Sequence, residues 1–291
     1  FVHGVLNTDN VTISGETIDY GPCAFLDAYD PATVFSSIDQ AGHYAYGNQA
    51  GITLWNLNRI AESLLPLLSG GDAASALESN PADEQSETGD GQGDSGATSD
   101  VDDALERAKS RALAALAHYG PAYGRAWLAG TRAKLGLAGE SHPHVTDDTI
   151  LKLASEMLAS LREHRVDYTS FFRALAEAVR GNREPLTELF SLTPLRDVTR
   201  DELVTGVPGT WLDRWLELTP DADAMNLVNP IYIPRNELLD EALDAASAGD
   251  LEPFRRMLAL VSAPFTPASG AERFEHPEFV GIRRHITYCG T

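Results

Sequence analysis

Cysteine is scarce in this sequence, and long apolar runs are missing. Two cysteines among 291 residues are too few for a disulfide scaffold or a thiolate metal site. No uncharged apolar run approaches the ~18 residues of a membrane-spanning helix, and no basic stretch followed by an apolar one opens the chain. We therefore expect no membrane span, no membrane partner and no signal peptide.

Positive charge is in short supply as well. Lysine and arginine together number 22 against 43 aspartates and glutamates, which gives a formal net charge of −21. Such a chain has no basic field with which to displace counterions from nucleic-acid phosphates, so we expect no nucleic-acid partner. Two free thiols are typical of a reducing compartment, and we expect a bacterial cytoplasmic protein.

Composition divides the chain into three parts. In the first part, residues 1–68, the stretch 1–47 is rich in glycine, β-branched and aromatic residues, and 51–68 have an apolar helical pattern. Residues 69–103 are a low-complexity acidic stretch without lysine, arginine or aromatic residues, which is typical of a disordered insertion. Residues 104–291 are mostly helical in pattern. A small β-region followed by a large helical body predicts an α+β fold.

The secondary structure expected from the pattern is one hairpin and a series of helices. The hairpin covers Asn10–Asp19, with Ser14-Gly15 at its turn. Thr146-Asp-Asp148 marks the start of a helix that continues through Leu161. The other predicted helices cover 51–68, 103–118, 122–136 (after a break at Gly120-Pro121), 169–180, 184–191, 199–206, 210–217, 235–248 and 251–261.

The first ten residues carry the most informative motif, His3-Gly-Val-Leu-Asn-Thr-Asp-Asn10. Kinase catalytic loops have the form H-x-D-x-x-x-x-N, in which the Asp accepts the substrate hydroxyl proton and the Asn binds Mg²⁺. His3 and Asn10 keep that spacing, but Val5 stands where the Asp is expected. An acid occurs instead at Asp9, beside the candidate metal ligand.

A second motif, Asp19-Tyr-Gly21, follows the predicted hairpin. It resembles the kinase D-F-G element, whose Asp holds Mg²⁺ against the nucleotide phosphates. The hairpin would fold the chain back so that Asn10 and Asp19 converge on one cation, and an amide and a carboxylate oxygen suit Mg²⁺. The same residues are also common hairpin-turn residues, so the motif alone leaves both interpretations open.

Further sequence pieces extend the resemblance beyond these two motifs. They are Thr17-Ile-Asp-Tyr-Gly-Pro22, Phe25-Leu-Asp27, Tyr29-Asp-Pro31, Gly47-Asn-Gln49, Leu54-Trp-Asn-Leu57, Asp167-Tyr-Thr with Phe172-Arg173, Trp211-Leu212 with Trp215, Asn229-Pro230 with Arg235-Asn236, and Cys289-Gly-Thr291. Together they resemble the selenoprotein O (SelO) family. The likeness covers essentially the whole chain outside the acidic insertion and is densest in residues 3–57.

This resemblance implies a protein-kinase-like fold, with a mostly helical C-lobe preceded by a catalytic loop and a small β-hairpin. It implies an enzyme that transfers AMP from ATP to Ser, Thr or Tyr hydroxyls of proteins. ATP and such proteins would be its partners. Asp9 would be the catalytic proton acceptor, Asn10 and Asp19 the ligands of Mg²⁺ or Mn²⁺, and Asp19 would also lie near the ATP phosphates.

Two departures qualify what the resemblance implies. The family's nucleotide-binding lobe, with its glycine-rich loop and phosphate-binding Lys, lies upstream of the catalytic loop and is absent from this sequence, which begins with Phe1. We therefore expect upstream sequence to be missing and the isolated chain to bind ATP–Mg²⁺ weakly or not at all. Ile231-Tyr-Ile-Pro234 replaces a basic-apolar run, which puts the local helix start in question.

Two other functions and one redox element stay open. The chain could be a kinase-like phosphotransferase, since Asn10 and Asp19 would serve either reaction, or a non-catalytic interaction fragment. In this family the C-terminal region carries a cysteine or selenocysteine. Cys23 and Cys289 could accordingly form a disulfide that restrains the segment after Asp19. Two unpaired thiols are the alternative, because cytosolic disulfides are rare.

Overall fold

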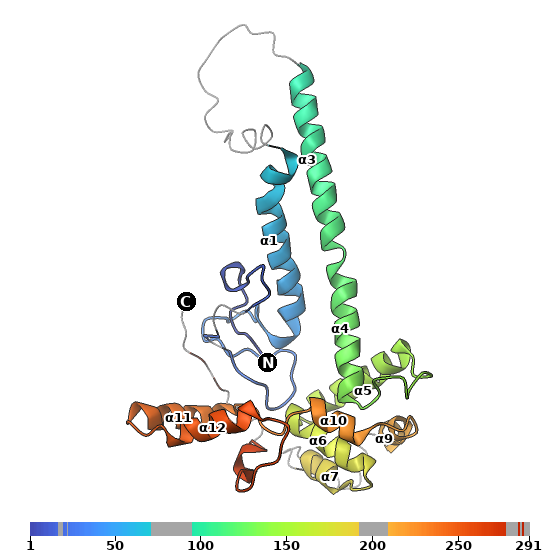
Figure 1. The fold of residues 1–291 in the computed structure, drawn as a ribbon, viewed down its shortest axis with the longest axis vertical. Helices are drawn as coiled ribbons and strands as arrows, with labels where there is room; N and C mark the ends of the chain where they lie inside the picture. The colour runs from blue at the N-terminus through green and yellow to red at the C-terminus, as the bar shows by residue number, and fades with distance from the viewer. Residues whose placement is uncertain are drawn as a thin grey trace. The chain divides into compact units, whose positions relative to one another are not determined.

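The described part of the chain is mostly helical. The computed structural model describes residues 1–16, 20–21, 23–70, 95–191, 209–277, 285 and 287, with the backbone alone for 95–101 and 209–210. The described helices (Figure 1) are α1 (Gln49–Ser69), α3 (Ser95–Leu116), α4 (Tyr119–Lys134), α5 (Asp147–Glu163), α6 (Tyr168–Val179), α7 (Glu184–Ser191), α9 (Gly209–Leu216), α10 (Ala222–Val228), α11 (Asn236–Ser247) and α12 (Glu252–Ser262), with short 3-10 turns η1 (Thr8–Asn10), η2 (Tyr46–Asn48) and η3 (Glu272–Phe274). None of these helices is long and apolar enough to cross a membrane.

Most of the helices expected from the sequence occur at or near their predicted positions. A break between two helices occurs as predicted, but it lies at Ala117-His118 and not at Gly120-Pro121, because α4 begins at Tyr119 and includes both of those residues. A proline in the first turn removes an N–H that has no intrahelical partner there. Helix α10 was not predicted, although Asp221 caps it by accepting from the N–H groups of Asp223 and Ala224. The helix expected at 199–206 lies outside the described residues.

The β-structure of the described residues is limited to isolated bridges. These pair Val2 with Ala24, Ala28 with Asp167, and Ser36 with Thr287. At the predicted hairpin the Gly15 N–H donates to the Thr12 carbonyl at 3.2 Å, which closes a turn. The return arm at Thr17–Asp19 lies outside the described residues, so the hairpin itself stays a prediction. The described chain is thus helical with single bridges, and the expected α+β character is not confirmed.

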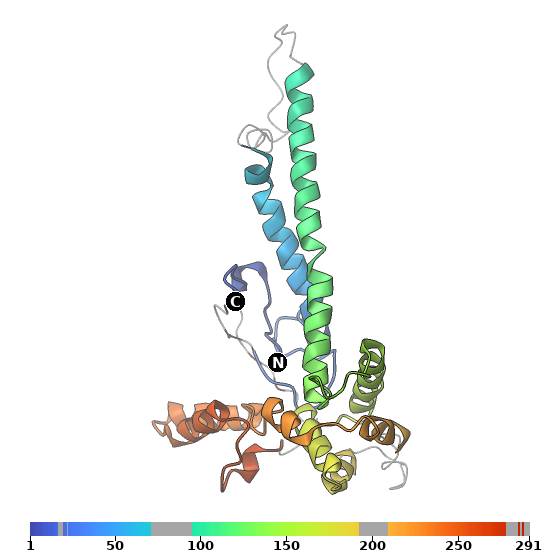
Figure 2. The same ribbon diagram turned by 45° about the vertical axis from the view of Figure 1, so that its right-hand side comes forward.

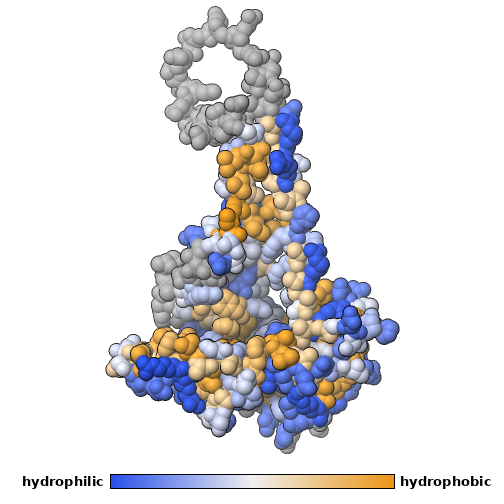
Figure 3. All heavy atoms as spheres, in the orientation of Figure 1, coloured by the Kyte–Doolittle hydropathy of each residue, from blue (hydrophilic) through white to orange (hydrophobic). Residues whose placement is uncertain are grey.

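The chain divides into two compact units. One comprises Phe1–Val5, Asp19–Gln49 and Arg125–Thr291; the other comprises Leu6–Ile18 and Ala50–Gly124. In the second unit, α1 and α3 run side by side in both ribbon views (Figures 1 and 2). In the C-terminal half of α1, the side chains of Ile60, Leu64 and Leu67 are exposed. Figure 3 shows an apolar surface on this helix in orange. Helix α3 begins at Ser95, inside the segment 69–103 expected to be disordered.

The core of the larger unit forms around α6, which packs against α7 and α10. The apolar face of α6 is buried from Phe171 to Ala178. Two tryptophans of α9 close one side: the indole N–H of Trp211 donates to the Leu153 carbonyl at 3.0 Å, and that of Trp215 to the Leu135 carbonyl at 3.1 Å. These bonds satisfy the polar atoms of fully buried rings. Helices α11 and α12 lie side by side and share a smaller core (Figures 1 and 2).

The end of α4 has a glycine that the backbone requires. Gly136 has φ +67°. Its N–H donates to the Ala133 carbonyl at 3.1 Å, and the Leu137 N–H donates to the Arg132 carbonyl at 2.8 Å. This pair of bonds is the Schellman arrangement, in which the residue after the helix adopts the left-handed conformation that glycine tolerates best.

Replacing Gly136 by alanine is expected to lower the free energy of unfolding by about 2–4 kcal/mol, from left-handed strain and overpacking. A Cβ there would lie 2.8 Å from the Asp221 carbonyl oxygen and from Met225 Cγ. Gly139→Ala is the matched control, because Gly139 also has a positive φ but no atom within 4 Å of its Cβ position. Urea unfolding of both variants measures the difference, and equal losses would contradict the steric explanation.

Candidate active site

The segment that precedes the candidate catalytic loop is tied to the segment that follows Gly21. Val2 and Ala24 exchange two main-chain hydrogen bonds, at 2.9 and 3.0 Å. Both side chains are buried in the core of the larger unit. These contacts bring residues far apart in sequence together and position the start of the His3–Asn10 motif.

The position of the usual kinase base does not offer a reactive group. Val5 is buried, with 5% of its surface exposed, so the apolar side chain contributes to packing. His3 is also buried, and its main-chain N–H donates to Gln49 Oε1 at 2.9 Å. Its two ring nitrogens make no hydrogen bond within the described residues. Among the described residues, His3 therefore holds the loop through its main chain and not through its ring.

Asp9 and Asn10 lie on the 3-10 turn η1, at the end of the loop. The turn is closed by the Asn10 N–H, which donates to the Asn7 carbonyl at 3.3 Å. Asp9 is exposed and Asn10 is half-buried, so the acid is accessible to a substrate. Asp19 lies outside the described residues, and its convergence with Asn10 stays a prediction.

Two amide side chains of α1 hold the main chain of this region, and the sequence pattern did not single them out. Gln49 Nε2 donates to the Phe1 carbonyl at 3.1 Å, in addition to its bond with His3. In the smaller unit, Asn56 Nδ2 donates to the Leu6 carbonyl at 3.0 Å. The available signal was an amide within the apolar run Leu54-Trp-Asn-Leu57, because a buried polar side chain needs a specific partner.

A buried ion cluster includes Asp27, which lies in the segment that follows Gly21. Arg235, at the start of α11, donates to Asp27 Oδ1 at 2.7 Å and to Asp167 Oδ2 and Oδ1 at 2.6 and 3.0 Å. It also donates to the Glu275 carbonyl at 3.1 Å. Asp167 meanwhile caps α6 by accepting from the Ser170 N–H at 2.7 Å. One guanidinium therefore joins three separate stretches of the chain.

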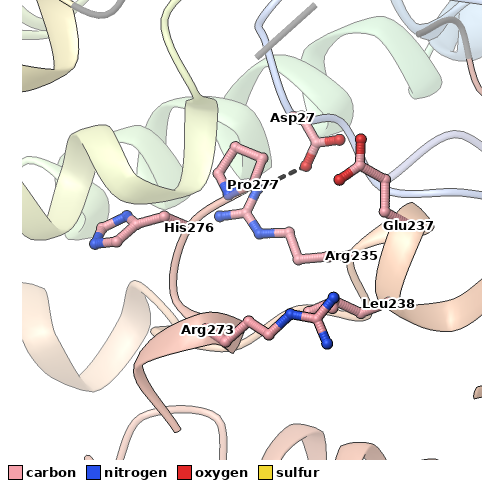
Figure 4. Close-up of a pocket in the computed structure, with 7 residues that line it drawn as sticks. All are labelled: Asp27, Arg235, Glu237, Leu238, Arg273, His276 and Pro277. Carbon is pink, nitrogen blue, oxygen red and sulfur yellow. Dashed lines mark hydrogen bonds and ion pairs between the residues drawn. The ribbon is translucent and has the colours of Figure 1, made fainter. Parts of the chain in front are cut away.

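The electrostatics of this cluster are those of a structural ion pair. Burial raises the pKa of Asp27, and the neighbouring Arg235 only partly offsets that effect. Burial alone would lower the pKa of Arg235, but Asp167 and Asp27 outweigh it and raise that pKa. Figure 4 shows the Arg235 side chain reaching toward Asp27 in a small pocket that is also lined by Glu237 and Arg273. Neither Asp9 nor Asn10 lines this pocket.

The described residues contain no group of three or more His, Cys, Asp or Glu side chains placed to hold a metal ion. Mg²⁺ commonly takes only one or two carboxylates from the protein and the remaining ligands from phosphate and water. The loop offers an amide oxygen at Asn10, and the second predicted ligand, Asp19, has a carboxylate. This oxygen-donor chemistry fits Mg²⁺ or Mn²⁺ and does not fit a thiolate-seeking metal.

The chain is similar in sequence to known proteins that are named as nucleotidyltransferases. The chain is 46% identical over its whole length to a protein nucleotidyltransferase YdiU of Mycobacterium sp. (strain KMS), 45% identical to that of Cereibacter sphaeroides (strain KD131) and 41% identical to that of Pseudarthrobacter chlorophenolicus. It covers 50% of each of these relatives, and so spans about half the length of the curated relatives it matches.

A match to a sequence model of a protein family shows to which family the chain belongs. Residues 1–262 match the model described as protein adenylyltransferase SelO. The chain therefore belongs to the SelO family, and the resemblance inferred from its motifs is confirmed. The match includes the whole candidate loop, the ion cluster through Arg235, and α12.

Proposed function

We propose that this chain carries the metal-binding and proton-accepting part of a protein adenylyltransferase, which transfers AMP from ATP to Ser, Thr or Tyr hydroxyls of proteins. The observation that carries the proposal is the turn Thr8–Asn10, which follows a buried Val5 and leaves Asp9 exposed. Membership of the SelO family and the name of the YdiU relatives as nucleotidyltransferases support the reaction class.

The roles of the residues follow from their chemistry. Asp9 accepts the proton of the attacking hydroxyl, because an exposed carboxylate can reach a group on another protein. Asn10 and Asp19 supply oxygen ligands to Mg²⁺ or Mn²⁺. When bound, the cation would neutralise charge that develops on the phosphate oxygens. The buried Val5 leaves Asp9 as the acidic side chain available within the His3–Asn10 motif.

The proposal includes the kinase-like organisation. Residues 1–68 would comprise the catalytic loop, the metal-binding hairpin and the first helix of a C-lobe, 69–103 an acidic insertion, and 104–291 the helical body. The Arg235 cluster supports this organisation, because it fixes the segment after the Asp19-Tyr-Gly21 motif against the starts of α6 and α11.

The position of the radioactive label in ATP tests the reaction. We expect a chimera, in which this chain replaces the matching half of the Mycobacterium sp. (strain KMS) relative, to transfer label from α-labelled but not γ-labelled ATP to protein. The parent relative is the control for assay conditions. Transfer from γ-labelled ATP would establish the phosphotransferase alternative. A folded chimera that transfers neither label, beside an active parent, would favour a non-catalytic fragment and contradict the proposal.

A further inference from the structure

We propose that Asn56 is a positioning residue for the candidate catalytic loop, an inference that rests on the proposed adenylyl transfer. Asn56 lies on α1 and is buried, with 5% of its surface exposed. Its Nδ2 group donates to the Leu6 carbonyl at 3.0 Å, across 50 residues of sequence. The bond therefore connects a rigid helix to the main chain of the loop.

Of the two polar atoms of the Asn56 amide, the Nδ2 donor makes the hydrogen bond to Leu6 and the Oδ1 acceptor does not. Asn56 Oδ1 is buried and makes no hydrogen bond within the described residues. A buried polar atom without a partner costs free energy that an apolar side chain would not. The asparagine therefore carries a stability cost at this position, and the bond to Leu6 is the feature that a leucine could not supply.

The carbonyl that Asn56 fixes directly precedes the functional turn. Leu6 is followed by Asn7, whose carbonyl accepts from the Asn10 N–H at 3.3 Å and closes η1. Asn56 thus holds the residue that precedes Asn7, the N-cap of the turn that bears Asp9. A single hydrogen bond of this kind contributes about 1 kcal/mol, enough to change the population of the ordered turn about fivefold.

A second amide on the same helix binds the main chain in the same manner. Gln49 accepts from the His3 N–H and donates to the Phe1 carbonyl. Gln49 and Asn56 are separated by about two helical turns, so the two side chains project from the same face of α1. Side-chain amides suit this purpose because they bond to main-chain atoms whatever the neighbouring side chains are.

Asn58 provides a matched control on the same helix. Its Nδ2 group donates to the Leu54 carbonyl, a bond within α1. Asn56→Leu removes the donor to the loop while keeping a side chain that branches at Cγ, and Asn58→Leu makes the same chemical change, with the same gain in helix propensity, away from the loop. Asn56→Ala is a second variant that removes the donor without adding a branched side chain.

Amide hydrogen exchange in the chain as it stands tests the contact without any enzymatic assay. We expect Asn56→Leu and Asn56→Ala to speed exchange at residues 6–10 by about five- to tenfold. Exchange in α5 and α6 should stay unchanged, and Asn58→Leu should leave residues 6–10 unchanged. Equal exchange in parent and Asn56 variants, or an equal increase with Asn58→Leu, would overturn the assignment of Asn56.

Kinetics in the active chimera tests the consequence for the reaction. Asn56→Leu should lower kcat about tenfold and raise the Mg²⁺ concentration needed for half-maximal rate, with KM for ATP little changed. A loss of folded protein alone would lower the amount of activity without moving the Mg²⁺ dependence. If the unsubstituted chimera transfers no AMP, the proposed function fails and the exchange result still decides the loop contact. Unchanged kcat and Mg²⁺ dependence in an active chimera would overturn the positioning role.

Discussion

Replacing Arg235 by methionine is expected to lower the free energy of unfolding by about 3–5 kcal/mol, because it leaves buried carboxylates without their counter-charge. Arg235 is 2% exposed and Asp167 is fully buried in its side chain. Asp27, at 26% exposure, would lose the same partner. The variant would also remove the side-chain link from Asp27 to the starts of α6 and α11.

Urea unfolding, monitored by tryptophan fluorescence, measures this loss, since Trp211 and Trp215 lie in the core of the larger unit. Arg273→Met is the matched control. Arg273 lines the same pocket, but it pairs with Glu241 at 2.6 Å in a setting where both side chains are about half exposed. Exposed ion pairs contribute about 0–1 kcal/mol. Comparable losses for the two variants would contradict the buried-charge explanation.

The loss of unfolding free energy caused by Arg235→Met should also depend on pH. The direction of that dependence follows from the change in the pKa of Asp27. Burial already raises that pKa in the folded state, and Arg235 opposes the rise. Without Arg235 the folded-state pKa rises further above the unfolded value. A group with a raised folded pKa stabilises the fold at low pH and loses that contribution as pH increases. We therefore expect the deficit to be largest near neutral pH and to shrink as pH is lowered toward the acidic range.

The helices were predictable because their information is local. Apolar spacing and Thr146 as a cap both act within a few residues of the helix they define. The short helix α10 was missed because its signal is limited to one cap, Asp221, and one turn of apolar residues. The start of α4 was misplaced because Gly120-Pro121 was interpreted as a break, although both residues lie in the first turn.

The candidate site was predictable only where its residues are contiguous. The His3–Asn10 motif named Asp9 and Asn10, and the structure places both on one turn. The Arg235–Asp27 pair joins residues 208 positions apart, and periodicity carries no information about such pairs. Asp27, Asp167 and Arg235 each belonged to a piece that resembled the family, but their mutual contact required the fold. Asn56 was missed for a related reason, because its partner is a main-chain carbonyl that no side-chain pattern records.

Replacing Asp9 by asparagine is expected to reduce AMP transfer by the active chimera about 10²–10⁴-fold, the usual contribution of a positioned general base. Asparagine keeps the size of the side chain but cannot accept the hydroxyl proton. The loss should fall on kcat, with KM for ATP retained, because the proposed role concerns the attacking hydroxyl and not nucleotide binding. Glu16→Gln is the matched control, since Glu16 is an exposed acid in the same unit.

Two outcomes distinguish the proposed base from a metal ligand. If Asp9 accepts the proton, raising the Mg²⁺ or Mn²⁺ concentration should not restore the rate of Asp9→Asn, whereas a lost metal ligand is compensated at least in part by excess cation. An Asp9→Asn chimera that keeps most of its kcat would contradict the assignment, and Val5 offers no substitute, because its side chain is packed in the interior. The reaction would then require a proton acceptor from outside the His3–Asn10 motif, since Asp9 is the acidic residue that this motif contains.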